Sequence, residues 1–428
     1  MRIAVFTSKY PARVATFFER DMRSLIDAGV EVDVFPIYPL DGAMWKYSLD
    51  LLDDRQLPRD RVHHIGFRES LRRSVPVLRQ RLGRCLGDAR DILPAAARFG
   101  TMTLAKTAYV LPKAWAWAAT AGDRYDHVLA YWGNYAATCA YAFHRLLPRP
   151  VPFSICLHAG TDLYRTRAFL REKLRYADAI ITCCEYNRGY IWRQFALDVR
   201  EVAPKLHVCH HGLDLTAFPF QPDGRPVDRI VGVGRLARHK GFDYLLLAAY
   251  LLRSRGIDIT VELVGEGPQR PALAALADIL GIADRVRLWG WLPFAQTRDI
   301  MRGATLLVHP SDGLGDGLPN VLREAMALGT PVVASDVAGI PDALCDGCGV
   351  LVPSRDPAAL ADAVAALLQD PARRRDIAIR ARRRAEERYD MARTGPQLVE
   401  ILSTTRRGGA TADTGVGDYR AVLAAGGH

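Results

Sequence analysis

The sequence lacks the features that mark several common protein classes. No stretch of about 20 mostly apolar residues is free of charges and prolines, so we expect no membrane-spanning helix. The N-terminus has no charged start followed by the apolar run of a secretory signal, and we therefore expect a cytoplasmic protein. No short sequence repeat is present.

Paired cysteine motifs are also scarce. Most of the eight cysteines lie in apolar, strand-like contexts, which favours reduced core thiols over a disulfide framework. Cys345-Asp-Gly-Cys348 is a lone CxxC motif without a second pair. Because a structural zinc ion normally needs four ligands, we expect no metal there.

The charge is unevenly distributed. The formal net charge is +10 and the pI about 9.3, which favours an anionic partner. Seven arginines crowd residues 68–90, and an apolar stretch interrupted by charges and prolines follows over residues 92–120. Two interpretations remain open for this segment: contact with an anionic membrane surface, or helices packed on the domain with solvated arginines.

The order of apolar runs predicts an α/β protein with parallel sheets, because short β-rich runs alternate with helix-period stretches. We expect two doubly wound Rossmann-like domains, 1–212 and 229–390, joined by the Pro-, Asp- and Gly-rich linker 213–228. A helix over 391–404 and an unstructured tail over 405–428 would follow. Ligands of such sheets bind at the carboxyl ends of the strands, so we expect a cleft between the domains. The predicted strands are 3–7, 30–37, 127–131, 152–157, 179–183 and 206–209, then 229–233, 260–264, 286–289, 305–309, 331–335 and 349–352.

The first candidate site follows the strand at 229–233. Gly234, Arg235 and Lys240 precede a predicted helix, and a helix N-terminus with two cations suits a diphosphate. The glycines do not form a dinucleotide fingerprint, because no third glycine stands at the required place, so a nicotinamide dehydrogenase is not expected. Solvated loop cations are the alternative.

The second candidate site is the loop and helix in HPSDGLGDGLPNVLREAMALG, residues 309–329. Pro319 suits the first helical position, a helix is predicted over 320–328, and Gly329 ends it. Glu324, near the positive end of that helix, can accept two hydrogen bonds from a vicinal diol such as a ribose. Asp316 lies eight residues earlier on a glycine-rich loop. A capping aspartate with a surface glutamate is the alternative.

A third candidate is His158, which directly follows an apolar strand in PFSICLHAGTDLYR. A histidine in this position is either a structural core residue or a group that faces the ligand.

Taken together, these stretches resemble the retaining glycosyltransferases of family 4, which have the GT-B fold. VGRLARHKGFDYLL resembles the family's phosphate-binding segment, and DGLPNVLREAMALGTPVVASD resembles the region of its E-x7-E motif. HAGTDLY and KLHVCHHGLDLTAF are similar to the acceptor domain of bacterial exopolysaccharide members, including colanic-acid-type enzymes. The likeness covers roughly residues 1 to 400.

The resemblance implies roles for the candidate residues. Arg235 and Lys240 would neutralise the donor diphosphate, Glu324 would hold the ribose, and Asp316 would take the place of the first glutamate, near the transferred sugar. His158 would contact the sugar or its phosphate. The remaining contacts would be made by the backbone of Gly317, Leu318 and Pro319 for sugar and phosphate, and by Gly290 for the base.

The expected function is therefore retaining transfer of a sugar from a UDP- or GDP-type nucleotide sugar to a glycan or lipid-linked acceptor in bacterial polysaccharide synthesis. We expect no metal, because fixed cations and helix-end amides can stabilise the leaving diphosphate and no cluster of oxygen ligands is present. No other cofactor and no nucleic-acid partner is expected. The alternatives are a nucleotide-sugar epimerase of the same fold and a non-catalytic nucleotide-sugar-binding protein.

Overall fold

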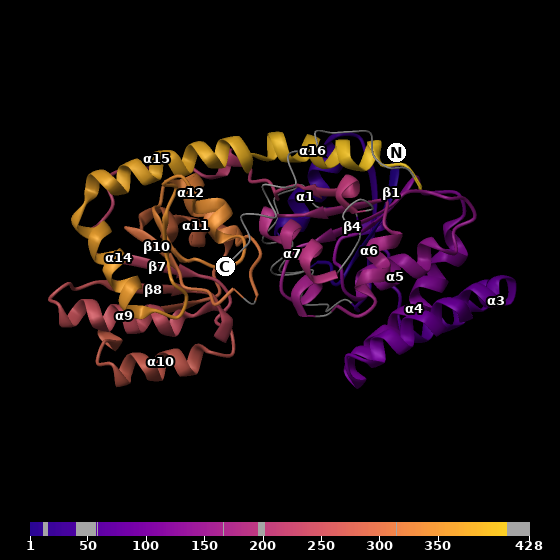
Figure 1. The fold of residues 1–428 in the computed structure, drawn as a ribbon, viewed down its shortest axis with the longest axis horizontal. Coiled ribbons are helices and arrows are strands. Elements are labelled where there is room, and N and C mark those ends of the chain that lie inside the picture. The colour runs from indigo at the N-terminus through magenta and orange to yellow at the C-terminus, as the bar shows by residue number, and fades with distance from the viewer. Residues whose placement is uncertain are drawn as a thin grey trace. The chain divides into compact units, whose positions relative to one another are not determined.

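The structure is a computed structural model that describes residues 1–11, 16–39, 57, 59–165, 167–195, 202–313 and 315–408. It divides into two compact units (Figure 1). The first unit consists of Met1–Cys209 together with the chain from Gly395, and the second of His210–Thr394.

The first unit is built on a six-stranded parallel sheet with the order β2-β1-β3-β4-β5-β6. Its helices are α1 (Thr16–Asp27), α3 (Phe67–Ala97), α4 (Thr101–Ala121), α5 (Tyr135–His144), α6 (Leu170–Tyr176) and α7 (Glu185–Phe195). Its strands are β1 (Arg2–Thr7), β2 (Glu31–Pro36), β3 (His127–Ala130), β4 (Phe153–Leu157), β5 (Ala179–Thr182) and β6 (Leu206–Val208).

The second unit repeats this plan with the strand order β12-β11-β10-β7-β8-β9, again all parallel. Its strands are β7 (Arg229–Val233), β8 (Thr260–Val264), β9 (Val286–Gly290), β10 (Leu306–His309), β11 (Val332–Ser335) and β12 (Val350–Val352). Its helices are α9 (Phe242–Ser254), α10 (Arg270–Ile279), α11 (Phe294–Gly303), α12 (Asn320–Leu328), α13 (Ile340–Leu344), α14 (Pro357–Gln369) and α15 (Pro371–Arg388). The helix α16 (Met391–Thr404) leads back into the first unit.

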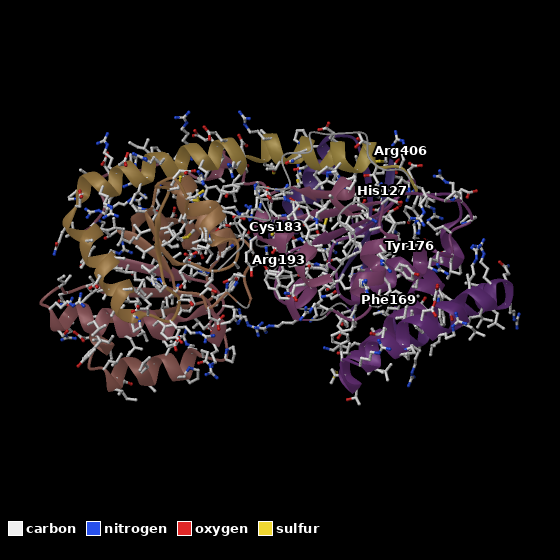
Figure 2. The ribbon with its side chains drawn as sticks, in the orientation of Figure 1. His127, Phe169, Tyr176, Cys183, Arg193 and Arg406 are labelled. Carbon is white, nitrogen blue, oxygen red and sulfur yellow. The ribbon has the colours of Figure 1, made fainter. Side chains whose placement is uncertain are left out.

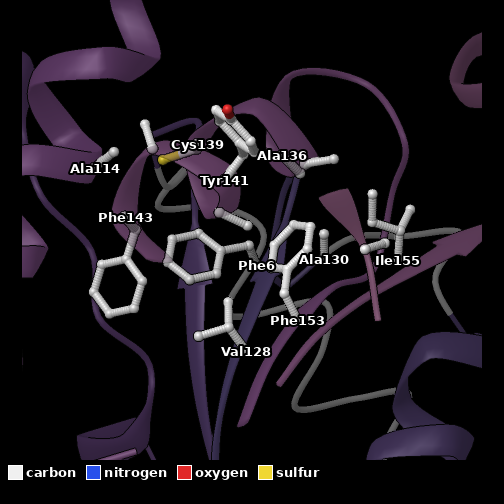
Figure 3. Close-up of a cluster of buried hydrophobic side chains, with 14 of the residues drawn as sticks. Phe6, Ala114, Val128, Ala130, Ala136, Cys139, Tyr141, Phe143, Phe153 and Ile155 are labelled. Atoms are coloured by element: carbon white, nitrogen blue, oxygen red, sulfur yellow. The ribbon is translucent and has the colours of Figure 1, made fainter. Parts of the chain in front are cut away.

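The predicted α/β class and all twelve predicted strands are confirmed. Strands of a parallel sheet are covered on both faces and therefore appear as continuous apolar runs, which is why they were recognisable. In the first unit, Phe6 of β1 stacks 4.9 Å from Phe35 and lies 5.0 Å from Phe143 of α5 (ring centroids), within a core that Figure 3 shows in close-up.

The basic and apolar segment 67–121 forms two long helices that lie side by side at the periphery of the first unit (Figure 1). Proline is found inside both helices, at Pro76 and Pro94 in α3 and at Pro112 in α4. Within the described residues, no helix is both long enough and apolar enough to cross a membrane.

The predicted linker 213–228 packs entirely within the second unit. The guanidinium of Arg225 donates to the carbonyl oxygens of Ala304 at 3.0 Å and Leu328 at 3.0 Å, at the carboxyl ends of α11 and α12. Those carbonyls have no partner inside their own helix, so Arg225 satisfies them and fastens the segment to the unit.

The start of the predicted tail is also ordered. Thr405 is buried, and Arg407 pairs with Asp178 at 3.0 Å and lies over the ring of Tyr176 at 4.3 Å. Figure 2 labels Arg406 and Tyr176 among the side chains of the first unit. The remainder of the predicted tail, 409–428, lies outside the described residues.

All eight cysteines are free thiols, and all but Cys345 are buried, as predicted for reduced core cysteines.

Candidate functional site

The first loop of the candidate site links β7 to α9. Gly234 follows β7 with φ +152°, and a side chain on the facing Gly265 would place its Cβ 1.9 Å from the Gly234 oxygen. Only glycine fits at this close approach. Arg235 is exposed, whereas Lys240 closes a short 3-10 turn directly before Gly241, the residue that caps α9. The structure therefore places Lys240 directly ahead of a helix N-terminus, and Arg235 earlier on the same loop.

The second loop links β10 to α12 and packs directly on the first. The Ser311 hydroxyl and the Asp312 amide both donate to the His239 carbonyl oxygen, at 3.1 and 3.0 Å. Gly315 lies so close to the His239 ring that a Cβ there would be 2.4 Å from its Cδ2. These contacts fix the backbone beside Lys240 from the opposite loop.

Asp316 is the residue through which the side chains of the two loops meet. One carboxylate oxygen accepts a hydrogen bond from the Lys240 ammonium, and the other lies 3.1 Å from Nε2 of His309, the last residue of β10. Asp316 is only 8% exposed and His309 is fully buried. Both oxygens of the carboxylate are thus engaged by the protein. The predicted contact of Asp316 with the transferred sugar would use a remaining lone pair of these oxygens or exchange one of the two bonds.

The charges in this cluster follow from its geometry. Burial alone would raise the pKa of Asp316, but the Lys240 charge and the His309 hydrogen bond outweigh it and hold the pKa well below its usual value. Burial lowers the pKa of His309, although the Asp316 hydrogen bond opposes this shift. Asp316 is therefore ionised and His309 neutral at neutral pH, with its Nε2 hydrogen donated to Asp316.

The helix α12 occupies the range predicted for it, Asn320–Leu328, and Gly329 ends it with φ +74°. The prediction for Pro319 was wrong by one position. Pro319 precedes the helix with ψ 131°, an extended conformation, and its carbonyl accepts from the Leu322 amide at 3.3 Å. It is therefore the capping residue and not the first helical residue.

Glu324 lies one turn into α12 and is half-buried, between the buried Arg323 and Ala325. The preceding backbone is held in place, since the Gly317 carbonyl accepts from the Gly339 amide at 2.9 Å and Leu318 is 8% exposed. The helix end thus presents backbone amides at a fixed position.

Gly290, expected near the base, ends β9 with φ +75°. Its carbonyl accepts from the Gly265 amide at 2.8 Å, and a Cβ at Gly290 would lie 2.8 Å from the Glu266 carboxylate. The positive φ therefore disfavours a side chain at Gly290, whereas the exposed Glu266 carboxylate could move aside.

His158 belongs to the first unit, apart from the residues above. It directly follows β4, is 7% exposed, and its Nδ1 lies 3.2 Å from Asp162. Its ring lies 4.4 Å from the Trp132 ring and 4.9 Å from that of Tyr131. Burial would lower the pKa of His158, but the Asp162 hydrogen bond and charge overcome this effect and raise it.

His309 is the functional candidate that sequence reasoning missed. It ends an apolar run, where a histidine is readily taken for a core residue, and its partner is seven residues away on an irregular loop. The available signal was its position, because it occupies the carboxyl end of a central strand just as His158 follows one.

No group of three or more His, Cys, Asp or Glu side chains suited to a metal ion is found among the residues that the structure describes.

Two parallel six-stranded sheets with helices around them, in two successive units, define the GT-B fold. In keeping with this, HepE from Anabaena, solved in complex with UDP, matches the structure with a TM-score of 0.68 at 19% identity, over 94% of this chain and 99% of that one. Residues 227–370 match the family model described as glycosyl transferases group 1. This match identifies residues 227–370, and no longer a segment, as a glycosyl transferases group 1 domain.

The relatives include proteins named for exopolysaccharide synthesis. The amylovoran biosynthesis glycosyltransferase AmsK of Erwinia amylovora is 26% identical over 94% of this chain and 99% of its own length. The putative colanic acid biosynthesis glycosyltransferase WcaL of Escherichia coli (strain K12) is 31% identical over 46% of this chain. The matched region spans about half of WcaL, 51% of its length.

Proposed function

We propose that the protein is a retaining glycosyltransferase that moves a sugar from a UDP- or GDP-type nucleotide sugar to a glycan or lipid-linked acceptor in bacterial polysaccharide synthesis. The observation that supports this proposal is the pair of adjoining loops in the second unit: one carries Lys240 directly before the N-terminus of α9, and the other leads into α12, with Glu324 one turn inside that helix. The UDP in the HepE structure and the names of AmsK and WcaL support the choice of donor and acceptor class.

The proposed reaction breaks the bond between the anomeric carbon and the diphosphate oxygen, which keeps the electron pair. The acceptor hydroxyl oxygen forms the new bond to the anomeric carbon, and its proton passes to the departing diphosphate oxygen. Negative charge grows on the diphosphate during this step, and pre-positioned cations and backbone amides stabilise it without reorganising. Arg235 and Lys240 would serve in this way, so that transfer proceeds without a metal ion. Glu324 would accept hydrogen bonds from the two ribose hydroxyls.

The decisive experiment is a thermal-shift screen against UDP, GDP, ADP and their sugars, followed by a transfer assay with the ligand that stabilises most. A ligand at about 100 times its Kd stabilises a protein by about 2.7 kcal/mol, which is readily measured. Stabilisation by one nucleoside diphosphate and transfer from its sugar is the expected result. The proposal fails if none of them stabilises the protein.

Glu324→Ala tests the ribose contact. We expect this variant to fold normally and to lose transfer, because the diol loses its only proposed carboxylate partner. Glu387→Ala is a matched control, since Glu387 is an exposed glutamate of the same unit that pairs with Arg383 at 2.9 Å on α15. Transfer at the wild-type rate by Glu324→Ala would remove Glu324 from the site.

The alternative of a non-catalytic nucleotide-sugar-binding protein is favoured by one observation, the engagement of Asp316 by Lys240 and His309. Such a protein would be stabilised by a nucleotide sugar without consuming it. An epimerase would instead convert the sugar while it stays on the nucleotide. Product analysis of the same transfer assay separates these three outcomes.

We also propose that the first unit contacts an anionic membrane through exposed apolar side chains of α3, a helix that is kinked at Arg81. Before the kink, Phe67 (40%), Leu71 (46%) and Val75 (40%) are exposed four residues apart, and after it Leu82 (51%) and Leu86 (58%) are again four apart; we name these five side chains the α3 surface. Residues 67–99 carry eight arginines against three acidic residues. An apolar stripe flanked by arginines fits the boundary between acyl chains and anionic headgroups.

Vesicle sedimentation tests this contact. We expect the protein to pellet with vesicles of phosphatidylcholine and phosphatidylglycerol at low salt and much less with phosphatidylcholine alone, because exposed charges are screened as salt rises. The double variant Leu82→Gln/Leu86→Gln should lose binding. Ile279→Gln is a matched control, since Ile279 is 81% exposed on α10 of the second unit. Equal pelleting of the double variant and the control would contradict the proposal, and dimerisation lost in the double variant would instead assign the α3 surface to a second copy.

A further inference from the structure

The buried cluster of Lys240, Asp316 and His309 carries an inference beyond the general reaction. Asp316 occupies the place where the family resemblance puts a glutamate that contacts the sugar. In this chain the carboxylate instead bonds to Lys240 through one oxygen and to His309 through the other, and it is almost entirely buried. The hydrogen bonds of Asp316 therefore hold the side chains of Lys240 and His309 in place.

We propose that His309 and Asp316 are positioning residues that fix the Lys240 ammonium group at one place for the donor diphosphate. This inference rests on the proposed function as far as the diphosphate is concerned. Asp316 orients Lys240, and His309 in turn orients Asp316. Each side chain thus fixes the orientation of the next one, as in catalytic sites where a third group orients the base that acts on the reacting group.

The surroundings of the cluster explain why a third residue is needed. The Lys240 side chain is long and flexible, and a cation at an exposed site would sample many rotamers. Here the Lys240 side chain is only 14% exposed, and its backbone is held by the loop that bears Ser311 and Asp312. A carboxylate on an irregular loop would rotate without a second bond, and His309 supplies that bond from the end of a rigid strand.

The state of His309 fits this role. Its side chain faces Asp316, and Lys240 lies beyond that carboxylate, so both charges act on it. A neutral imidazole that donates from Nε2 fixes the carboxylate without neutralising it. Among the described residues, the buried Nδ1 of His309 has no hydrogen-bond partner, which agrees with its carrying no hydrogen.

The first arm of the test measures the position of Lys240 without using activity. The full-length protein is treated with acetic anhydride, and the acetylation rate of each lysine is followed by mass spectrometry. In the wild type, Lys240 should react slowly. His309→Leu and Asp316→Asn should raise its rate at least several-fold, whereas His309→Gln, which can still donate a hydrogen bond, should stay near the wild type.

Two controls separate this effect from general loosening. Lys205 donates to the carbonyl oxygens of Arg175 at 2.9 Å and Ala177 at 2.7 Å, so its rate reports the integrity of the first unit in the same sample. Thr330→Val removes another buried hydrogen bond of the second unit, from the Thr330 hydroxyl to the Met301 carbonyl oxygen at 2.9 Å, and should leave the Lys240 rate unchanged. An unchanged Lys240 rate in both His309→Leu and Asp316→Asn would overturn the inference.

The second arm uses transfer kinetics. Misplacing a catalytic group by about 1 Å can reduce the rate up to about a hundredfold. In His309→Leu, kcat should therefore fall strongly while KM for the donor changes little. In His309→Gln, most of the wild-type kcat should be recovered. Failure of His309→Gln to recover it would count against positioning. If the wild type transfers no sugar, the proposed function fails, and the acetylation rates alone decide whether His309 and Asp316 hold Lys240.

Discussion

Each of the two units contains a hydrogen-bonded histidine and aspartate at an equivalent place, but the two aspartates bind different further partners. In each unit a histidine lies at the carboxyl end of a parallel strand and bonds to an aspartate on the loop that follows. The distance is 3.2 Å between His158 and Asp162 in the first unit and 3.1 Å between His309 and Asp316 in the second.

The difference lies in the third partner of each carboxylate. Asp162 also accepts from the backbone amides of His158 and Ala159, both at 2.9 Å, so it ties its own loop together. Asp316 accepts instead from Lys240, which belongs to a loop 76 residues away. The first pair is therefore local, and the second connects two loops of the candidate site.

The pKa values of the two histidines move in opposite directions for this reason. Both are buried, and burial lowers the pKa of each. At His158 the hydrogen bond and charge of Asp162, together with Cys183 and Asp21, outweigh burial and raise the pKa overall. At His309 the Lys240 cation assists burial, and the pKa stays below its ordinary value. The comparison shows that a carboxylate partner does not by itself set the charge of a histidine.

Removing the cation from the second pair should have the largest effect. We expect Lys240→Met to destabilise the second unit by about 3 to 5 kcal/mol, because it leaves the buried Asp316 carboxylate without its charge partner. Transfer should also be lost. Chemical denaturation and the transfer assay measure the two effects.

The double variant Lys240→Met/Asp316→Leu sharpens this prediction. Replacing both charges by apolar groups should recover part of the stability, because the unpaired carboxylate is gone while the buried His309 Nε2 hydrogen is left without its acceptor, and none of the activity. A Lys240→Met variant as stable as the wild type would mean that the ion pair contributes little, and the contrast between the two units would then lose its basis.

Breaking the local pair should have a smaller effect, confined to the first unit. Asp162→Ala removes the acceptor of two backbone amides and of the His158 ring, and leaving buried donors unpaired costs about 2 kcal/mol. We expect lower stability with unchanged affinity for a nucleoside diphosphate, measured by calorimetry. Weaker binding of the diphosphate by this variant would contradict the assignment of Asp162 to the architecture of its loop.

Much of the fold was predictable because its signals are local. The strand β10 was predicted over 305–309 and is observed at Leu306–His309, and α12 was predicted within its observed bounds. Continuous apolar runs mark buried parallel strands, and Gly329 marks a helix end through its left-handed conformation. The positions of Arg235, Lys240 and Glu324 ahead of or inside helices followed from the same signals.

The features that escaped prediction depend on distant contacts. Nothing local indicates that Asp316 bonds to Lys240, since the two are 76 residues apart. The proline-containing helices α3 and α4 were not resolved as two helices, because proline is read as a helix breaker while packing can tolerate it. The predicted linker belongs to the second unit because of Arg225, whose carbonyl partners lie about 80 residues further along the chain or more.

The smallest expected effect is the difference between the pKa values of His158 and His309. His158 has a raised folded-state pKa, so its contribution to stability is fully present below the unfolded value of about 6.5 and is lost as pH rises through the folded-state pKa. His309 has a lowered pKa, so its contribution is present above about 6.5 and is lost as pH falls through the folded-state pKa.

Ring-proton NMR titration of the wild type, with His158→Gln and His309→Gln to assign the signals, measures both pKa values. The same titration is then repeated in the Lys240→Met variant, which removes the cation and keeps the Asp316 carboxylate. In this variant the pKa of His309 should move upward, toward that of His158. The double variant Lys240→Met/Asp316→Leu is not suitable here, because it removes the carboxylate as well. A pKa of His309 that stays in place would show that burial alone sets it, and that the third partner is not what distinguishes the two histidines.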